Sequence, residues 1–152
     1  MDQLDYQILK LLKENGRESA SNISKKVRLS VSAVLDRIKK LEENGAIKCY
    51  TIIVDEKAMG NDMTAIMEIS LENPKYYDSF TEAICRFDNV VDCYYMTGDF
   101  DFILKISCSC TEELDRMHRL IKNIQGVAAT RTHFVLRQVK NIYSTIPLPN
   151  EK

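Results

Sequence analysis

The chain has 152 residues, of which 45% are hydrophobic and 28% charged, with five Gly and three Pro. This composition is typical of one ordinary domain or two small ones, and it excludes collagen-like, low-complexity and disordered chains. No apolar run approaches the roughly 18 residues of a membrane span. The acidic first residues are unlike a signal peptide, so we expect a cytoplasmic protein without a membrane segment.

The cysteine content and the charge distribution indicate the redox environment and the kind of partner. Five cysteines without a Cys-x-x-Cys pair predict free thiols rather than a disulfide framework. The formal net charge is −1, yet residues 20–50 contain seven basic residues against three acidic ones. A basic patch in an otherwise acidic chain favours a polyanionic partner.

Three helical patterns open the chain. The first ends near Gly16, and its apolar stripe has i, i+4, i+7, i+8 spacing: Leu4, Ile8, Leu11 and Leu12. Ser19 or Ser21 can cap a second helix. Ser30 can cap a third helix, which we expect to end at Gly45 after burying Val34, Ile38 and Leu41.

The opposite face of the third helix has small residues in its first turn and cations further along. A short helix, a turn and a cationic second helix are the parts of a DNA-binding helix-turn-helix. We predict DNA contacts from the following residues of both helices and their turn: Lys25, Lys26, Arg28, Ser30, Ser32, Ala33, Asp36, Arg37, Lys39 and Lys40. Arg37 is expected to contact a base or a neighbouring helix, with Asp36 and Glu42 close to it.

Residues 46–54 follow Gly45 directly and have the composition of a strand, which is the position of a wing. The alternative is a structural three-helix bundle whose charges are simply solvated. A protein that binds an effector without binding DNA is a further alternative, although the cationic set argues against it.

A second periodicity begins after the polar segment 55–61, the predicted linker. The pattern predicts a strand at 63–71, a helix opened by Pro74 and two strands joined by a two-residue hairpin at Gly98-Asp99. A helix capped by Thr111 and a final strand over 127–139 complete the order. We therefore expect an α+β protein: a winged helix-turn-helix over 1–54 and a ferredoxin-like βαββαβ domain over 62–152.

A sheet of this kind has helices on one face only. The chain has no further helix for the other face, so we predict a homodimer in which a second copy covers it.

Enzymatic and metal-binding alternatives rest on few residues. Asp99 and Asp101 are an acid pair, but no nucleophile motif, phosphate loop or neighbouring histidine accompanies them. Cys108 and Cys110, with His118 and His133 elsewhere, are a weak metal signal that small core residues explain equally well. We expect no catalytic residues, no metal and no cofactor.

The order of these motifs resembles the Lrp/AsnC (feast/famine) family of prokaryotic transcriptional regulators. In the first domain the resemblance rests on Leu4-Asp5-x-x-Ile8-Leu9 and on the run from Ser30 through Arg37-Ile38-x-x-Leu41-Glu42-x-x-Gly45. In the second it rests on Thr97-Gly98-Asp99-Phe100-Asp101-Phe102, Gly126-Val127 and Thr130-Arg131-Thr132. Two positions depart from the family pattern, since relatives often have Gly at Arg28 and Pro at Val31. Because Gly is usual at this turn position, we expect Arg28 to have a positive φ.

The resemblance implies a regulator that binds double-stranded DNA as dimers or rings of dimers, commonly octamers, and responds to a free amino acid. By position it implies an effector site formed by Tyr95, Gly98, Asp99, Asp101, His133, Phe134 and Val135. Asp99 or Asp101 can accept from the ammonium group, and backbone N–H groups beside Gly98 can donate to the carboxylate. The alternative for Gly98-Asp99 is a simple hairpin turn.

Overall fold

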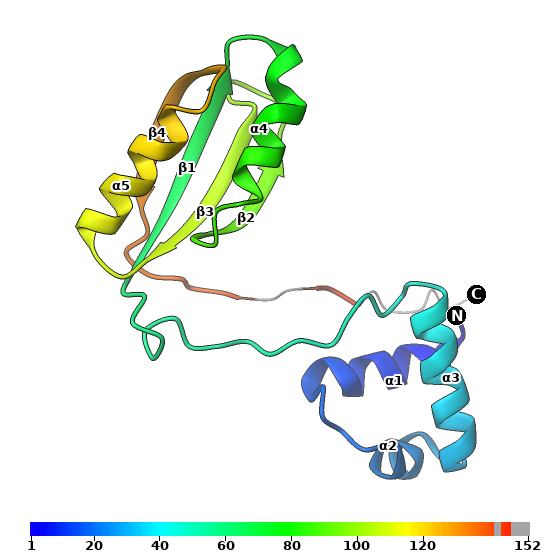
Figure 1. The fold of residues 1–152 in the computed structure, drawn as a ribbon. Coiled ribbons are helices and arrows are strands. Elements are labelled where there is room, and N and C mark those ends of the chain that lie inside the picture. Colours follow the sequence, from blue (N-terminus) through cyan, green and yellow to red (C-terminus); the bar gives the residue numbers. More distant parts are fainter. Residues whose placement is uncertain (142–143, 147–152) are drawn as a thin grey trace. The chain divides into compact units, whose positions relative to one another are not determined.

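The computed structural model describes residues 1–141 and 144–146, and the chain divides into two compact units (Figure 1). One is built on Met1–Ile53 and the other on Val54–Lys140. No helix in these described ranges is long and apolar enough to cross a membrane.

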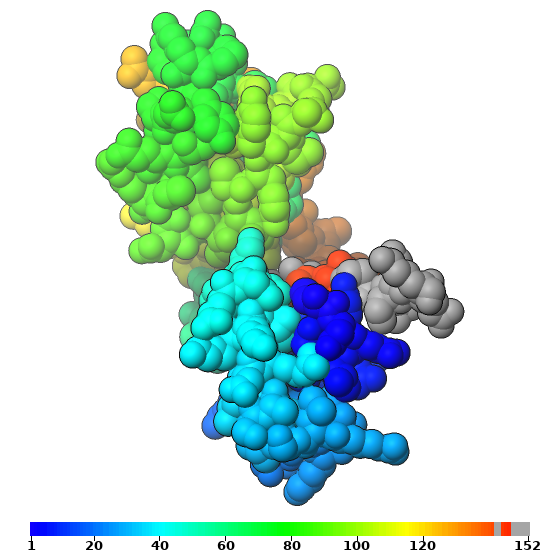
Figure 2. Space-filling model, turned by 90° about the vertical axis from the view of Figure 1, so that its right-hand side faces the viewer, coloured from blue at the N-terminus to red at the C-terminus, as the bar shows by residue number. Residues whose placement is uncertain are grey.

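The first unit consists of α1 (Gln3–Glu14), α2 (Ala20–Val27) and α3 (Val31–Glu43). Side chains of Asp2, Ser19 and Ser30 accept backbone N–H groups at the three helix starts, as N-cap residues do. The three helices share one small core: Ile8, Ile23, Val27, Val34 and Leu41. Figure 2 shows the blue start of the chain packed against the cyan α3. These features confirm the predicted three-helix arrangement.

The predicted wing strand is not formed: residues 46–54 belong to no strand. An isolated extended segment has no neighbouring strand to satisfy its backbone groups. The segment is nevertheless attached to α3, since the Tyr50 hydroxyl donates to Glu42 Oε1 at 2.9 Å. Its apolar residues Ile52 and Ile53 are exposed.

The second unit has the predicted βαββαβ order. Its strands are β1 (Met63–Leu71), β2 (Val90–Tyr95), β3 (Phe102–Cys108) and β4 (Val127–Phe134). They form an antiparallel sheet in the order β2-β3-β1-β4. A 3-10 turn (η1, Pro74–Tyr76) leads into α4 (Tyr77–Ile84), and α5 (Thr111–Lys122) precedes β4.

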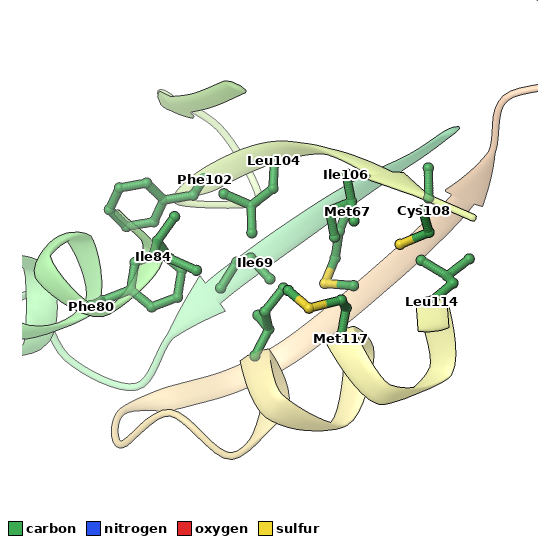
Figure 3. Close-up of a cluster of buried hydrophobic side chains, with 12 residues drawn as sticks. Met67, Ile69, Phe80, Ile84, Phe102, Leu104, Ile106, Cys108, Leu114 and Met117 are labelled. Carbon is green, nitrogen blue, oxygen red and sulfur yellow. The ribbon is translucent and has the colours of Figure 1, made fainter. Parts of the chain in front are cut away.

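Alternate residues of β1 and β3 point toward the helices and form the core of the second unit (Figure 3). Met67, Ile69, Leu104 and Ile106 are buried there, against Phe80 of α4 and Met117 and Ile121 of α5. The period-two pattern of these strands is therefore the one the sequence predicts.

Three predicted boundaries in this unit are wrong. The final strand ends at Phe134 rather than at residue 139, and Leu136 beyond it is 97% exposed. Thr111 is the first residue of α5, and Cys110 occupies the N-cap position without a side-chain cap bond. The β2–β3 connection is longer than a two-residue hairpin, because Tyr95 pairs with Phe102 and the Met96 N–H donates to Asp101 O.

The segment expected as a linker belongs with the second unit, which begins at Val54. Glu56 anchors it, since the Ser107 hydroxyl donates to Glu56 Oε2 at 2.8 Å. The Asn61 amide donates to the same oxygen at 3.0 Å, and together these bonds hold the pKa of Glu56 below its usual value.

Candidate functional site

The outer face of α3 presents the small and charged residues predicted to meet DNA. Ser32, Asp36, Lys39 and Lys40 are exposed, whereas Ala33 and Arg37 are half-buried. The Ser30 hydroxyl accepts the Ala33 N–H at 3.2 Å and lies 3.1 Å from the Ser32 hydroxyl, so it is occupied as a cap. The first turn therefore offers short side chains, which allow a helix start to approach a groove closely.

The cations predicted to contact DNA differ in whether they form ion pairs within the chain. Lys26 forms an ion pair with Glu18 at 3.0 Å, and Lys39 lies 3.7 Å from Glu43. Within residues 1–141 and 144–146, no ion-pair partner lies near Lys25, Arg28 or Lys40. Those three exposed cations are the ones free to meet phosphate oxygens.

Arg37 contacts a neighbouring helix, the second of its two predicted roles. Its Nη1 lies 2.6 Å from Asp5 Oδ1 and 2.8 Å from Asp2 Oδ2, at the start of α1. The expected neighbours Asp36 and Glu42 are not its ion-pair partners. Sequence reasoning missed Asp2 and Asp5, although acids three residues apart at a helix start are the signal of a capping box.

Arg28 occupies the turn between α2 and α3 in the left-handed conformation, with φ of 56°. Among the described residues it is the one non-glycine with positive φ. The positive φ expected at this position is therefore confirmed, and it costs about 1 kcal/mol for a residue with a Cβ.

The predicted effector loop joins β2 to β3. Tyr95 is 64% exposed, and its ring packs edge-on against Tyr77 with centroids 4.9 Å apart. Gly98 has φ of 132°, and a Cβ at this position would meet no atom within 4 Å, so its backbone is open to a ligand. Asp99 is exposed, and its carbonyl accepts from the Ser70 hydroxyl at 3.4 Å.

Asp101 is tied to β1 by two bonds. Its N–H donates to Ile69 O at 2.8 Å, and its Oδ2 accepts from the Leu71 N–H at 2.7 Å. One carboxylate oxygen is thus used to hold the loop on the end of β1. The loop is therefore anchored by one of the two residues expected to bind the ligand ammonium group.

His133, Phe134 and Val135 lie at the opposite end of the sheet from this loop. Phe134 pairs with Ala65 at the start of β1, whereas Asp101 bonds to Leu71 at its end. Roughly six residues of strand separate these points by about 20 Å. A single chain therefore does not bring the two halves of the predicted effector site together.

The sheet face away from α4 and α5 has a central row of charges. Glu68 of β1 lies 3.7 Å from Arg131 and 3.6 Å from His133, both on β4. Both distances are to Glu68 Oε2, which is buried and makes no hydrogen bond among the described residues. Ile66 and Ile103 are half-buried beside this cluster on the same face.

The cysteines and histidines of the metal alternative are separated by their environments. Cys108 is buried in the core, where burial raises its pKa to about 11, while Cys110 is exposed. His118 Nε2 lies 3.1 Å from the Thr130 hydroxyl. Within the described residues, no three His, Cys, Asp or Glu side chains are grouped as metal ligands.

A three-helix unit with a cationic third helix, followed by a βαββαβ domain, defines a helix-turn-helix transcriptional regulator with a separate ligand-binding domain. Residues 1–48 match the winged helix-turn-helix DNA-binding family. Residues 64–144 match the Lrp/AsnC ligand binding domain. The chain therefore belongs to the Lrp/AsnC family, whose members are transcriptional regulators rather than enzymes.

Known regulators are similar to this chain over nearly its whole length. The HTH-type transcriptional regulator FL11 of Pyrococcus horikoshii is 35% identical over 140 residues, which cover 92% of each chain. The leucine-responsive regulatory protein of Haemophilus influenzae is 32% identical over 92% of this chain and 86% of its own. A transcriptional regulator of Neisseria meningitidis, solved as its L-Met complex, superimposes with a TM-score of 0.92 at 26% identity, covering 97% of both chains.

Proposed function

We propose that this DNA-binding regulator acts as a homodimer, or a ring of such dimers up to an octamer, whose DNA binding responds to a free amino acid. Such a protein works in the compartment that holds the DNA, the cytoplasm of a prokaryotic cell. The observation that carries the proposal is the division of the predicted effector residues between opposite ends of one sheet.

DNA binding in this proposal follows from the outer face of α3. In a dimer, two copies of α3 enter successive major grooves, and their short first-turn side chains permit close approach. The free cations Lys25, Arg28 and Lys40 supply phosphate contacts. The exposed side chains of Lys26 and Lys39 can add to them by leaving their partners Glu18 and Glu43.

The open sheet face supports dimerisation through the second domain. Neither α4 nor α5 covers this face, and it contains half-buried Ile66 and Ile103. It also contains Glu68 Oε2, a buried carboxylate oxygen whose ion-pair partners Arg131 and His133 lie 3.7 Å and 3.6 Å away, beyond hydrogen-bond distance. A donor from a facing copy would give this atom the hydrogen bond that buried acceptors nearly always have.

An effector site formed between subunits reconciles the separated residues. The loop with Gly98, Asp99 and Asp101 from one subunit would meet the end of β4, with Phe134 and Val135, from another. Phe134 is 51% exposed, so its ring is accessible to a second subunit. A ligand bound there favours whichever assembly completes its pocket, and this coupling is how it changes DNA binding.

An amino acid suits the chemistry of this loop. Its ammonium group needs an acidic acceptor, which Asp99 or the second carboxylate oxygen of Asp101 provides. Its carboxylate needs donors, and the backbone beside Gly98 is unobstructed. The L-Met complex of the Neisseria relative supports this ligand class.

Thermal unfolding of the purified protein against each of the twenty amino acids tests the proposal. A ligand at one hundred times its dissociation constant that binds only the folded protein adds about 2.7 kcal/mol of stability. We expect one chemical class of amino acid to raise the unfolding temperature. A flat panel would contradict amino-acid sensing.

A matched pair of variants places the ligand. Asp101→Asn keeps an oxygen for the Leu71 N–H but loses the negative charge, so it should remove the shift while preserving the fold. Asp78→Asn, at an exposed position of α4, is the control and should retain the shift. An unchanged response in Asp101→Asn would exclude Asp101 as the ammonium acceptor.

A further inference from the structure

Arg37 is the predicted DNA-binding cation that forms two ion pairs within the described part of the chain. Its side chain is 28% exposed, compared with 74% for Lys39, a cation two residues along the same helix. Both of its ion pairs are short, and both are to carboxylates at the start of α1. A guanidinium held by two carboxylates has little net charge left to attract a phosphate.

The two carboxylates are themselves fixed. The Asp5 N–H donates to Asp2 Oδ1 at 2.9 Å, and the Asp2 N–H donates to Asp5 Oδ2 at 2.8 Å. Each acid therefore uses one oxygen to cap α1 and the other to hold Arg37. The Asp5 N–H and then the Arg37 guanidinium lower the pKa of Asp2, and Asp5 and Asp2 raise the pKa of Arg37.

This Asp2–Asp5–Arg37 clamp joins residues 32 to 35 positions apart in the sequence. It adds a polar connection to a unit whose buried core is small. The clamp and Lys40 line one hollow at the junction of α1 and α3. A shift of α3 on α1 would therefore move Lys40, a free cation, relative to DNA.

We propose that Arg37 is a positioning residue for DNA binding: through Asp2 and Asp5 it fixes the recognition helix α3 on α1 and does not itself contact DNA. The start of α1 thereby becomes part of the DNA-binding machinery, although it presents no positive charge. DNA binding by the family does not by itself imply this role for Asp2, Asp5 or Arg37.

The test uses the full-length protein and a duplex chosen by in vitro selection with the wild type. Dissociation constants are measured over a series of salt concentrations, well below the unfolding temperature, with circular dichroism confirming that each variant is folded. The variants are Arg37→Met, Asp5→Asn and the double variant, with Arg37→Lys for rescue and Lys40→Ala as the phosphate-contact reference. Asp5→Asn keeps an oxygen for the cap but loses the charge that holds Arg37.

Positioning predicts that Arg37→Met and Asp5→Asn each weaken binding by about threefold to tenfold. The complex that forms still needs α3 in its bound position, so Lys40 keeps its phosphate contact there and the cost is that of holding the helix in place. The slope of log K against log salt should therefore stay at the wild-type value, whereas Lys40→Ala should reduce it. The double variant should be no weaker than either single variant, because both break the same clamp. Arg37→Lys should recover part of the loss. If Arg37→Met is unfolded, Asp5→Asn and Arg37→Lys carry the test.

Direct contact with DNA predicts a different pattern. Arg37→Met would then reduce the salt slope by about 0.9 for each phosphate that Arg37 neutralises in the wild type. Asp5→Asn would strengthen binding, because it would release the guanidinium toward DNA. Either result overturns the proposal, as would unchanged affinity in both single variants.

Discussion

The two units of this protein differ in what a single chain completes. The helix-turn-helix unit finds its partners within one chain. Its three helix starts are capped by side chains, its three helices share one core, and Arg37 is paired. The βαββαβ unit leaves one sheet face open. On that face the buried Glu68 Oε2 makes ion pairs but no hydrogen bond among the described residues, and the predicted effector residues lie at opposite ends of the sheet. We therefore propose that each chain completes its own DNA-contacting surface, whereas the effector site needs two chains.

The largest effect should come from charging the open face. Ile66→Asp places a carboxylate beside Glu68, at the centre of the proposed dimer surface. We expect the mass in solution to fall to that of a monomer. Apparent DNA affinity should fall by about 100-fold, because the two half-sites no longer bind as one unit.

Thr132→Asp is the control for that change, since Thr132 is exposed and pairs with Met67 on the opposite face of the sheet. It should remain a dimer with nearly normal DNA binding. A dimeric Ile66→Asp would remove the open face as the dimer surface and weaken the contrast between the units.

Lys40→Ala should sharpen the assignment of phosphate contacts within the first unit. The slope of log K against log salt should fall by about 0.9 for each contact, or about 1.8 for a dimer. Light scattering should show an unchanged mass. Lys13→Ala, an exposed cation in the last turn of α1, is the control and should leave the slope unaltered; an equal slope in the two variants would exclude Lys40.

Two substitutions at Arg28 separate backbone strain from charge. Both Arg28→Gly and Arg28→Ala lose the cation, so both should reduce the salt slope equally. Arg28→Ala keeps a Cβ at φ of 56° and should be less stable than Arg28→Gly by about 1 kcal/mol. Denaturant unfolding measures the difference, and equal stabilities would show that the turn relaxes.

The smallest effect concerns the segment after α3. Tyr50 is 53% exposed, and its partial burial and the bond to Glu42 raise its pKa from 10 to about 12. Because the pKa is raised in the folded protein, the protonated Tyr50 hydroxyl stabilises the fold below pH 10. This contribution is lost as the pH rises from 10 to about 12. Absorbance titration of tyrosinate, compared with Tyr50→Phe, should show one late-titrating group in the wild type; identical curves after scaling for tyrosine number would contradict it.

The sequence predicts what depends on local pattern. Ser30 as a cap, the buried stripe of Val34 and Leu41, and the positive φ of Arg28 all follow from neighbours within a few residues. The βαββαβ order likewise follows from strand and helix periods. These are short-range properties, and one chain is enough to determine them.

Contacts between distant residues could not be predicted in the same way. The partners of Arg37 lie at the start of α1, and the bond from Leu71 to Asp101 turns an expected two-residue hairpin into a longer anchored loop. Residues 46–54 have a strand-like composition but no partner strand within the described chain. In each case the outcome depends on which segments meet in space.

Subunit mixing tests the central claim, that the effector site spans two chains, most directly. Asp101→Asn carries a defective loop and Phe134→Ala a defective strand end, so each alone should lose binding of the amino acid that shifts the wild type most. Refolded together in equal amounts, they should regain about a quarter of the wild-type sites by calorimetry, because some pockets combine two intact halves. A mixture that binds no ligand would contradict a site shared between subunits.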